Sequence, residues 1–129
     1  MKVLLLSNDI YLIKLVTEFT SENGCKFLIF KDYEKPVTVV SNALSSNPNI
    51  LIVDDDLLKP NTKCILQSIK KVNKKIVLIF FTSNNSVGFG REITHIGVNY
   101  YHIKPINKID FEALLKSFIK LNSIYQEEQ

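Results

Sequence analysis

The stretch Asn49 to Pro60 reads N-I-L-I-V-D-D-D-L-L-K-P and decides the fold class. Its four apolar residues, Ile50 to Val53, are too few for a helix and too continuous for a half-exposed strand. They predict a central strand of a parallel sheet, with helices covering both faces. The three aspartates that follow then lie at the carboxyl end of that strand, where open α/β sheets bind their ligands. Asp54, the first of them, is the first candidate functional residue.

Length and composition indicate one ordinary globular domain over residues 1–129. The chain is 46% hydrophobic and 22% charged, a balance typical of folded domains. Its apolar runs are far shorter than the roughly 20 residues of a membrane span, and the run from Val3 to Leu6 is too short for a signal-peptide core. We therefore expect a cytoplasmic protein that does not bind a membrane. Cys25 and Cys64 have neither metal nor redox spacing and are expected to be reduced.

The charge pattern argues against direct binding of nucleic acid. The net charge of +3 is mild, and the lysines that cluster in the sequence form two short groups instead of a dense basic stripe. The first group is Lys70, Lys71, Lys74 and Lys75, and the second is Lys116 and Lys120. Cations near a helix C-terminus offset its dipole, which accounts for the first group as a solvated helix end.

Strand and helix patterns alternate along the whole chain. Apolar runs predict strands at Lys2–Leu6, Phe27–Phe30, Ile50–Val53, Ile76–Phe81 and Val98–Ile103. Apolar residues at i, i+3 and i+4 predict helices at Ile10–Glu22, Tyr33–Ser46, from Asn61 as the cap to Val72, at about Phe89–Ile96, and at Asp110–Tyr125. Five strands that alternate with five helices predict a doubly wound parallel α/β sheet.

The fourth helix is expected to be short because of its glycines. Gly88 and Gly90 each disfavour a helix by about 1 kcal/mol relative to alanine, and Gly97 ends it. The segment from Ser86 to Arg91 is therefore predicted to be the least rigid stretch of the chain, with fast hydrogen exchange.

Polar residues follow three of the predicted strands. Asp54 follows the third strand, Thr82 the fourth and Lys104 the fifth. The carboxyl ends of parallel strands meet at one edge of the sheet, so these side chains are expected to converge. A carboxylate, a hydroxyl and an ammonium together suit a phosphoryl group, with the carboxylate as acceptor and the other two binding its oxygens.

The sequence resembles the receiver domains of bacterial two-component response regulators along its whole length. The resemblance is strongest from Gly97 to Pro105, where G-V-N-Y-Y-H-I-K-P is similar to the family's G-A-x-x-[YF]-x-x-K-P. Thr82-Ser83 matches the family's Thr or Ser followed by a small residue, and Pro48 to Asp54 resembles the phosphoacceptor strand. The resemblance implies a flavodoxin-like sheet with strand order 2-1-3-4-5 and a cis peptide bond at Lys104-Pro105.

The resemblance also implies a signalling role and not an enzymatic one. A histidine kinase or a phosphotransfer protein would pass a phosphoryl group to Asp54. Thr82 and Lys104 would sense that group, and Tyr101 would act as an aromatic switch. A downstream protein or output domain would be the next partner.

We expect this partner to dock on the face formed by the helix Phe89–Ile96, the strand Val98–Ile103 and the last helix. A homodimer through the same face is a further candidate. Gly88 and Gly90 lie between Thr82 and Tyr101 in the sequence, so a phosphoryl group would be felt first in this segment.

The cation site departs from the family pattern. Receivers carry a pair of acidic residues directly after the first strand, and here that place is taken by Ser7-Asn8, with Asp9 next. Mg²⁺ prefers carboxylates and water in strict octahedral geometry. We therefore expect a weak Mg²⁺ site made by Asn8, Asp9 and Asp54, or none.

The register of the acceptor leaves an alternative open. Asp56, and not Asp54, stands four residues before Pro60 as in the family's loop. Asp54 fits the strand end and the distances along the chain to Thr82 and Lys104. We prefer Asp54 as the phosphoacceptor, with Asp56 as the alternative.

Plain structural interpretations and other functions also remain open. The three aspartates can be a solvated turn, Thr82 a helix cap, and Asn8 and Asp9 the start of a helix. Tyr101 can serve packing alone, and Lys104 and His95 can be ordinary surface residues. One other function is a degenerate receiver that binds proteins without phosphorylation. Another is a small flavodoxin-like enzyme or flavin carrier, although Ser7 to Tyr11 has no glycine or Ser/Thr-rich phosphate cradle.

Overall fold

The computed structural model describes the backbone of residues 1–32 and 35–127 and the side chains of this range as far as residue 120. Its strands are β1 (Lys2–Leu6), β2 (Lys26–Phe30), β3 (Ile50–Asp54), β4 (Val77–Thr82) and β5 (Tyr100–Ile103). Its helices are α1 (Ile10–Glu22), α2 (Pro36–Ser45), α3 (Asp55–Leu58), α4 (Thr62–Val72), α5 (Val87–Ile96) and α6 (Lys108–Glu127).

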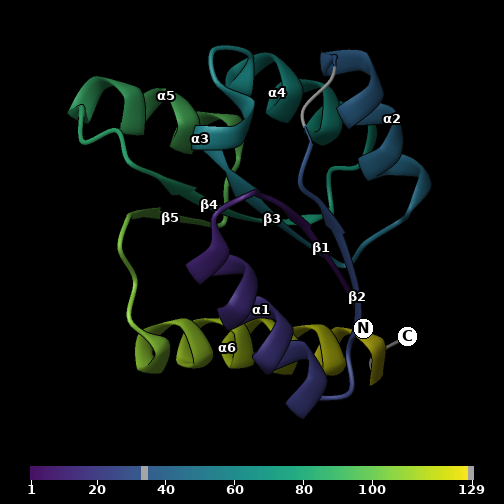
Figure 1. Ribbon diagram of the computed structural model, residues 1–129. Coiled ribbons are helices and arrows are strands. Elements are labelled where there is room, and N and C mark those ends of the chain that lie inside the picture. Colours follow the sequence, from purple (N-terminus) through teal and green to yellow (C-terminus); the bar gives the residue numbers. More distant parts are fainter. Residues whose placement is uncertain (33–34, 128–129) are drawn as a thin grey trace.

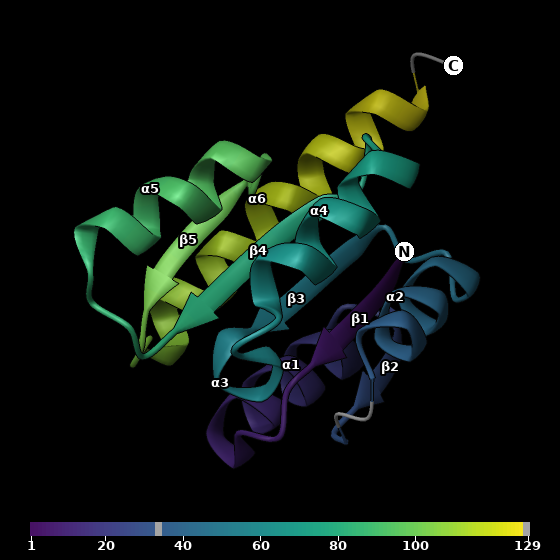
Figure 2. The same cartoon turned by 90° about the horizontal axis from the view of Figure 1, so that it is seen from above.

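The five strands form one parallel sheet in the order β2-β1-β3-β4-β5. Figure 1 shows the sheet as the middle layer, with α1 and α6 on one face and α2, α4 and α5 on the other. In Figure 2 the helices α5, α4 and α2 lie next to one another over the sheet. This is the doubly wound flavodoxin-like class that the sequence predicted, with the expected strand order.

The central strand β3 is buried along its whole length, as its apolar run required. In register, Leu6 pairs with Val53, Asp54 with Phe81, and Thr82 with Ile103. The carboxyl ends of β1, β3, β4 and β5 therefore meet at one edge of the sheet.

Side chains of successive strand residues point to opposite faces of the sheet. This alternation divides the core into two clusters. On the α1/α6 face, Ile52 and Phe81 pack with Phe19 and Phe111. On the α2/α4/α5 face the strands supply Leu51, Val53, Leu78 and Phe80, and the helices supply Val39, Ala43, Ile65, Leu66, Ile69 and Ile93.

Residues at the helix ends explain where several helices begin or stop, and α4 follows Asn61 as predicted. Asp9 caps α1, because its carboxylate accepts from the backbone N–H groups of Tyr11 and Leu12. Pro36 stands in the first turn of α2, where proline is tolerated. Tyr33, where this helix was predicted to begin, lies outside the described residues. Gly97 ends α5 with φ +109°, a conformation that favours glycine.

Helix α5 begins at Val87, two residues before the predicted start, and includes both Gly88 and Gly90. The Ser86 side chain accepts from the N–H of Phe89 at 3.3 Å, and Gly90 donates its N–H to the Ser86 carbonyl at 3.1 Å. The prediction that Gly88 lies outside the helix was wrong, since this cap and the buried Ile93 outweigh the cost of the two glycines.

Helix α3 was missed, so the structure has a sixth helix in the part of the chain that it describes. The side chain of Asp54 caps this single turn by accepting from the N–H of Asp56 at 3.0 Å. Asp55 and Asp56 lie in its first turn, where negative charge is favoured by the helix dipole, and Leu58 is fully buried. The same three aspartates thus form both the end of β3 and the start of α3.

Two further sequence expectations can be compared with the structure. Cys25 and Cys64 are free thiols. Among the described residues, the helices are all too short or too polar to span a bilayer.

Candidate functional site

The polar residues at the strand ends separate into two groups because of the alternation within each strand. Ser7, Asp54 and Lys104 continue the side-chain rows of the α1/α6 face. Asp55 and Thr82 continue the rows of the α2/α4/α5 face. The hydrogen bonds follow this division.

Asp54 is fully buried at the end of β3, and both of its carboxylate oxygens are hydrogen-bonded. Oδ2 accepts from the Ser7 hydroxyl at 2.6 Å and from the Lys104 ammonium at 2.8 Å. Oδ1 accepts from the N–H of Asp56 at 3.0 Å. One ammonium and two neutral donors thus supply the hydrogen bonds that a buried carboxyl group requires.

Lys104 connects three carboxylates. Its Nζ lies 2.8 Å from Asp54 Oδ2, 3.0 Å from Asp9 Oδ2 and 3.1 Å from Asp56 Oδ2. Burial by itself would lower the pKa of Lys104, but its bonds to Asp54, Asp9 and Asp56 outweigh burial and raise the pKa well above its ordinary value. The ammonium therefore stays protonated at physiological pH.

The same contacts keep Asp9 and Asp56 ionised. Burial would raise the pKa of Asp9, yet hydrogen bonds from Lys104 and from the N–H groups of Leu12 and Tyr11 lower it overall. Burial would likewise raise the pKa of Asp56, but the Ser83 hydroxyl at 2.6 Å and Lys104 lower it. The site thus holds one cation among three carboxylates.

Thr82 does not join this group and instead bonds to Asp55. Its hydroxyl donates to Asp55 Oδ2 at 2.8 Å, and Thr62, the first residue of α4, donates to Asp55 Oδ1 at 2.6 Å. The expectation that Asp54, Thr82 and Lys104 converge is confirmed for Asp54 with Lys104 and wrong for Thr82 in this arrangement. Asp55 and Thr62 had not been singled out in the sequence, although strand alternation puts Thr82 and Asp54 on opposite faces of the sheet.

Tyr101 packs beside the Asp55 group on the α2/α4/α5 face. Its ring stacks on Phe80 with centroids 5.5 Å apart and an interplanar angle of 14°, and its hydroxyl donates to the Asn84 carbonyl at 3.4 Å. Burial, and then the charge of Asp55, raise the pKa of the phenol. The ring is held by packing, and its role as a switch stays a prediction.

Asp9, Asp54 and Asp56 each direct one carboxylate oxygen to the Lys104 ammonium, at 3.0, 2.8 and 3.1 Å. Carboxylate oxygens are the ligands that a hard divalent cation prefers. Within residues 1–32 and 35–127, the acidic, histidine and cysteine side chains form no cluster of three that could hold a metal ion. Asn8, the other predicted ligand, is exposed beside Asp9. A metal ion would therefore compete with Lys104 for the same oxygens.

A cavity of about 350 Å³ opens beside Asp56 and not beside Asp54. Its walls come from the α3 to α4 segment, from the loop after β4 and from α5. They include Asp55, Asp56, Lys59, Pro60, Thr62, Lys63, Ser83, Asn84 and Phe89. Asp56 is thus the acceptor candidate that this cavity exposes, whereas Asp54 lies beneath Ser7 and Lys104.

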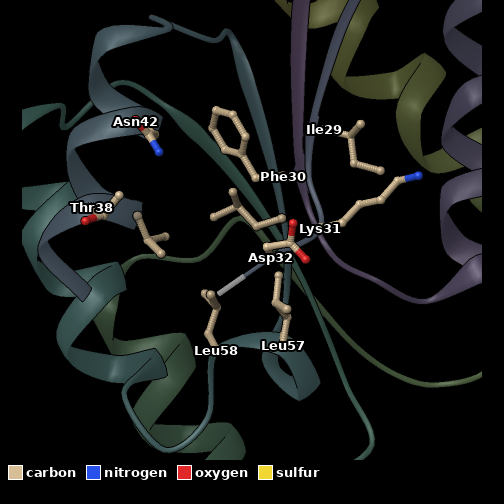
Figure 3. Close-up of a pocket in the computed structure, with 10 residues that line it drawn as sticks. Ile29, Phe30, Lys31, Asp32, Thr38, Asn42, Leu57 and Leu58 are labelled. Carbon is tan, nitrogen blue, oxygen red and sulfur yellow. The ribbon is translucent and has the colours of Figure 1, made fainter. Parts of the chain in front are cut away.

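A second cavity, of about 360 Å³, lies between the end of β2, α2 and α3. Figure 3 shows Thr38 and Asn42 of α2 on one side of this cavity and Leu57 and Leu58 of α3 on another. Phe30, at the end of β2, lies between α2 and the strands. Its described lining residues include none of the predicted site residues, so this cavity is separate from the carboxylate group.

Several plain structural interpretations can now be settled. The aspartates are not a solvated turn, since Asp54 and Asp55 are buried. Thr82 is not the cap of the following helix, because Ser86 has that role. Asp9 is a helix-start residue as well as a partner of Lys104, and His95 is an exposed residue of α5.

Comparison with known proteins identifies the class of fold. No family model matches the sequence, and no curated protein sequence matches it. Among solved structures, the chemotaxis response regulator CheY4 of Vibrio cholerae superposes with a TM-score of 0.74 at 16% identity, covering 91% of this chain and 97% of that one. A CheY-like response regulator receiver domain protein from Methanospirillum hungatei gives 0.74 at 18% identity, with coverages of 98% and 97%.

An orphan response regulator of H. pylori gives a TM-score of 0.75 at 18% identity and covers 92% of this chain and 95% of its own. The chain therefore has the fold of CheY-like response regulator receiver domains. At these identities the likeness concerns the fold, and the roles of individual residues have to be argued from the site itself.

Proposed function

We propose that this chain is a receiver module of a phosphorelay and that Asp54 is its phosphoacceptor. The observation that carries the proposal is the contact between Lys104 and Asp54. The ammonium lies 2.8 Å from a carboxylate at the carboxyl end of the central strand, and it follows the edge strand β5. The solved structures of the same fold described above are response regulators, and this supports a signalling role and not an enzymatic one.

The chemistry needs one carboxylate oxygen as nucleophile. An oxygen of Asp54 forms the new bond to phosphorus while the bond from phosphorus to the donor's histidine nitrogen breaks. Lys104, already charged and in place, binds the phosphoryl oxygens and offsets their charge. Ser7 and Lys104 must first yield Asp54 Oδ2 to the phosphorus, so they control access to the nucleophile.

The partners follow from this role. The donor is a histidine kinase or a phosphotransfer protein, and the recipient of the signal is a downstream protein or output domain. The downstream protein or output domain docks on the face made by α5, β5 and α6, in which β5 is an edge strand. Alternatively, the chain forms a homodimer through that face. Mg²⁺, held weakly by Asp9 and Asp54, would neutralise charge between the donor phosphoryl group and Asp54. A cytoplasmic location belongs to the same proposal.

One observation favours a second candidate, a receiver fold that binds its partner without phosphorylation. Asp54 has an exposed fraction of 0%, and three donors satisfy its two oxygens. Lys104 already supplies a positive charge to the Asp54 carboxylate without a phosphoryl group, as a phosphorylation-independent module would need.

The two candidates differ in one reaction. The protein is incubated with acetyl phosphate and Mg²⁺ and its intact mass is measured, in parallel with the variants Asp54→Asn, Asp56→Asn and, as a control, Asp110→Asn. Asp110 is an exposed aspartate at the start of α6. We expect a gain of one phosphoryl group in the unchanged protein, in Asp56→Asn and in Asp110→Asn, and none in Asp54→Asn.

Loss of labelling in Asp56→Asn alone would move the acceptor to the residue that faces the cavity. A complete lack of labelling, also with a phosphorylated histidine phosphotransfer protein as donor, would support the second candidate.

A further inference from the structure

Asp55 forms a buried bridge that is separate from the Asp54 site. Its side chain accepts from Thr62 at 2.6 Å through Oδ1 and from Thr82 at 2.8 Å through Oδ2. Asp55, Thr62 and Thr82 have exposed fractions of 4%, 2% and 0%. The bridge therefore connects the start of α3, the start of α4 and the end of β4 in a place that is almost closed to solvent.

The bridge uses the only proton that Thr82 can donate. A threonine hydroxyl has one O–H donor and two acceptor lone pairs. Here the proton goes to Asp55, and the oxygen accepts from the N–H of Asn84 at 3.0 Å. Thr82 can donate to another acceptor at the sheet edge only after it leaves Asp55. A hydrogen bond to a buried ionised carboxylate is among the stronger ones, so this exchange is resisted.

We propose that Asp55 is a positioning residue that holds Thr82 in the resting arrangement and so sets how readily the loop after β4 can rearrange. The hold of Asp55 on Thr82 does not depend on phosphorylation. Its signalling consequence rests on the proposed function, in which a phosphoryl group on Asp54 competes with Asp55 for the Thr82 proton.

The contacts around the loop show how the bridge reaches the expected docking face. Asn84 donates its N–H to Thr82, and its carbonyl accepts from the Tyr101 hydroxyl at 3.4 Å. Tyr101 lies against Gly90 of α5, where a Cβ would be 3.5 Å from the ring. In this proposal, a change at Thr82 reaches Tyr101 and α5 through the contacts of Asn84, as a switch between two arrangements would require.

The variant Asp55→Asn tests the bridge with little change of shape. An amide offers one neutral acceptor oxygen and one NH₂ donor group in place of two charged oxygens. Thr82 then either donates to a weaker acceptor or accepts from the amide and keeps its proton free. Both outcomes loosen Thr82, while the buried hydroxyls of Thr62 and Thr82 keep partners.

Two further variants separate positioning from general loosening. Thr62→Val also removes one hydrogen bond from Asp55 but leaves the bond to Thr82 intact. Thr94→Val removes a hydroxyl that donates at 2.7 Å to the Gly90 carbonyl of its own helix and is exposed. The readout is the χ1 rotamer distribution of Thr82, measured by NMR three-bond couplings on the unphosphorylated protein.

We expect one Thr82 rotamer in the unchanged protein, in Thr62→Val and in Thr94→Val, and at least two in Asp55→Asn. We also expect beryllofluoride, a phosphoryl mimic, to bind Asp55→Asn several-fold more tightly than the unchanged protein, with no gain for Thr62→Val. A single unchanged rotamer in Asp55→Asn overturns the proposal, as does equal release of Thr82 in Thr62→Val.

Failure of the proposed function gives a different result. If Asp55→Asn releases Thr82 but no variant binds beryllofluoride or accepts a phosphoryl group, the positioning role of Asp55 stands and the phosphoacceptor role of Asp54 falls. If Asp55→Asn does not fold, the unchanged protein still decides. The Thr82 hydroxyl proton must then give a slowly exchanging NMR signal, and a rapidly exchanging one overturns the proposal.

Discussion

The Ser7 hydroxyl donates a 2.6 Å hydrogen bond to Oδ2 of Asp54, which joins the residue after β1 to the last residue of β3. Both side chains are fully buried. The Ser7 oxygen also accepts from the N–H of Asp9 at 3.0 Å. Ser7 thus stands where the resemblance to receivers places an acidic residue, and it stabilises the Asp54 carboxylate where a second carboxylate would repel it.

Removing this donor should destabilise the fold. Hydrogen bonds to charged groups contribute about 1.5 to 3 kcal/mol, so we expect Ser7→Ala to lower the free energy of unfolding by about 2 kcal/mol in urea titrations. The control is Ser117→Ala, whose exposed hydroxyl donates only to its own helix at Leu114 and should change the stability by less than about 0.5 kcal/mol. Equal losses in both variants would show that the Ser7 bond contributes no special stability.

Restoring acidity after β1 should strengthen cation binding. We expect the unchanged protein to bind Mg²⁺ in the millimolar range or more weakly, since Lys104 already occupies the point between the carboxylates. The double variant Ser7→Asp and Asn8→Asp should bind at least about tenfold more tightly, at some cost in stability without metal because like charges crowd together. Calorimetry measures both affinities, with Ser117→Asp as a control for added charge. Micromolar binding by the unchanged protein would contradict the weak site.

Replacing Lys104 should reverse the acid dependence of stability. In the unchanged protein the pKa values of Asp9 and Asp56 are lowered on folding, so their contribution is present above about pH 4 and is lost as the pH falls through the folded pKa values. In Lys104→Met three carboxylates face one another without a cation, which should cost about 3 kcal/mol at pH 7. The folded pKa values of Asp9 and Asp56 then rise, and stability should increase as the pH falls from 7 to 5.

Urea titrations at several pH values test this sign. Lys108→Met is the control, because Lys108 is an exposed lysine that pairs with Glu18 at 3.4 Å and does not touch the site. A Lys104→Met profile that runs parallel to that of the unchanged protein would mean that Lys104 does not hold the three charges together.

Hydrogen exchange should locate the docking face. The sequence predicted fast exchange from Ser86 to Arg91, but Gly90 donates its N–H to Ser86 inside α5. We now expect the fastest exchange from Ser86 to Gly88, where the first helical turn is exposed. Binding of a partner, or dimerisation seen by sedimentation, should slow exchange there. Protection confined to α2 and α4 would place the docking face on those two helices, away from β5 and α6.

Some parts of this protein could be predicted directly from local patterns. Ile50 to Val53 had to form a central strand, because a continuous apolar run needs cover on both faces. Asp9 and Gly97 marked helix ends through side-chain capping and through a left-handed backbone, which depend on neighbours only a few residues away. The contact of Lys104 with Asp54 was also predictable, since parallel strands end at the same edge of the sheet.

Other parts were predicted incorrectly because short-range patterns competed with tertiary contacts. Helix α3 is too short to show a periodic pattern, and it forms because Leu58 is buried and Asp54 caps it. Helix α5 keeps two glycines because Ser86 caps it and Ile93 anchors it in the core. In both cases packing outweighs the local preferences of the residues.

The sequence by itself determined the five strands and the five longer helices along the chain, and it placed Asp54, Thr82 and Lys104 at the carboxyl edge, because these depend on periodicity and chain direction. Only the tertiary structure decided which oxygen accepts from which donor. Asp54, Asp55 and Asp56 are adjacent in sequence, yet one bonds to Ser7 and Lys104, the next to Thr62 and Thr82, and the third to Ser83 and Lys104. Each step along the backbone at a strand end turns the side chain to another side, and partners distant in sequence complete each site.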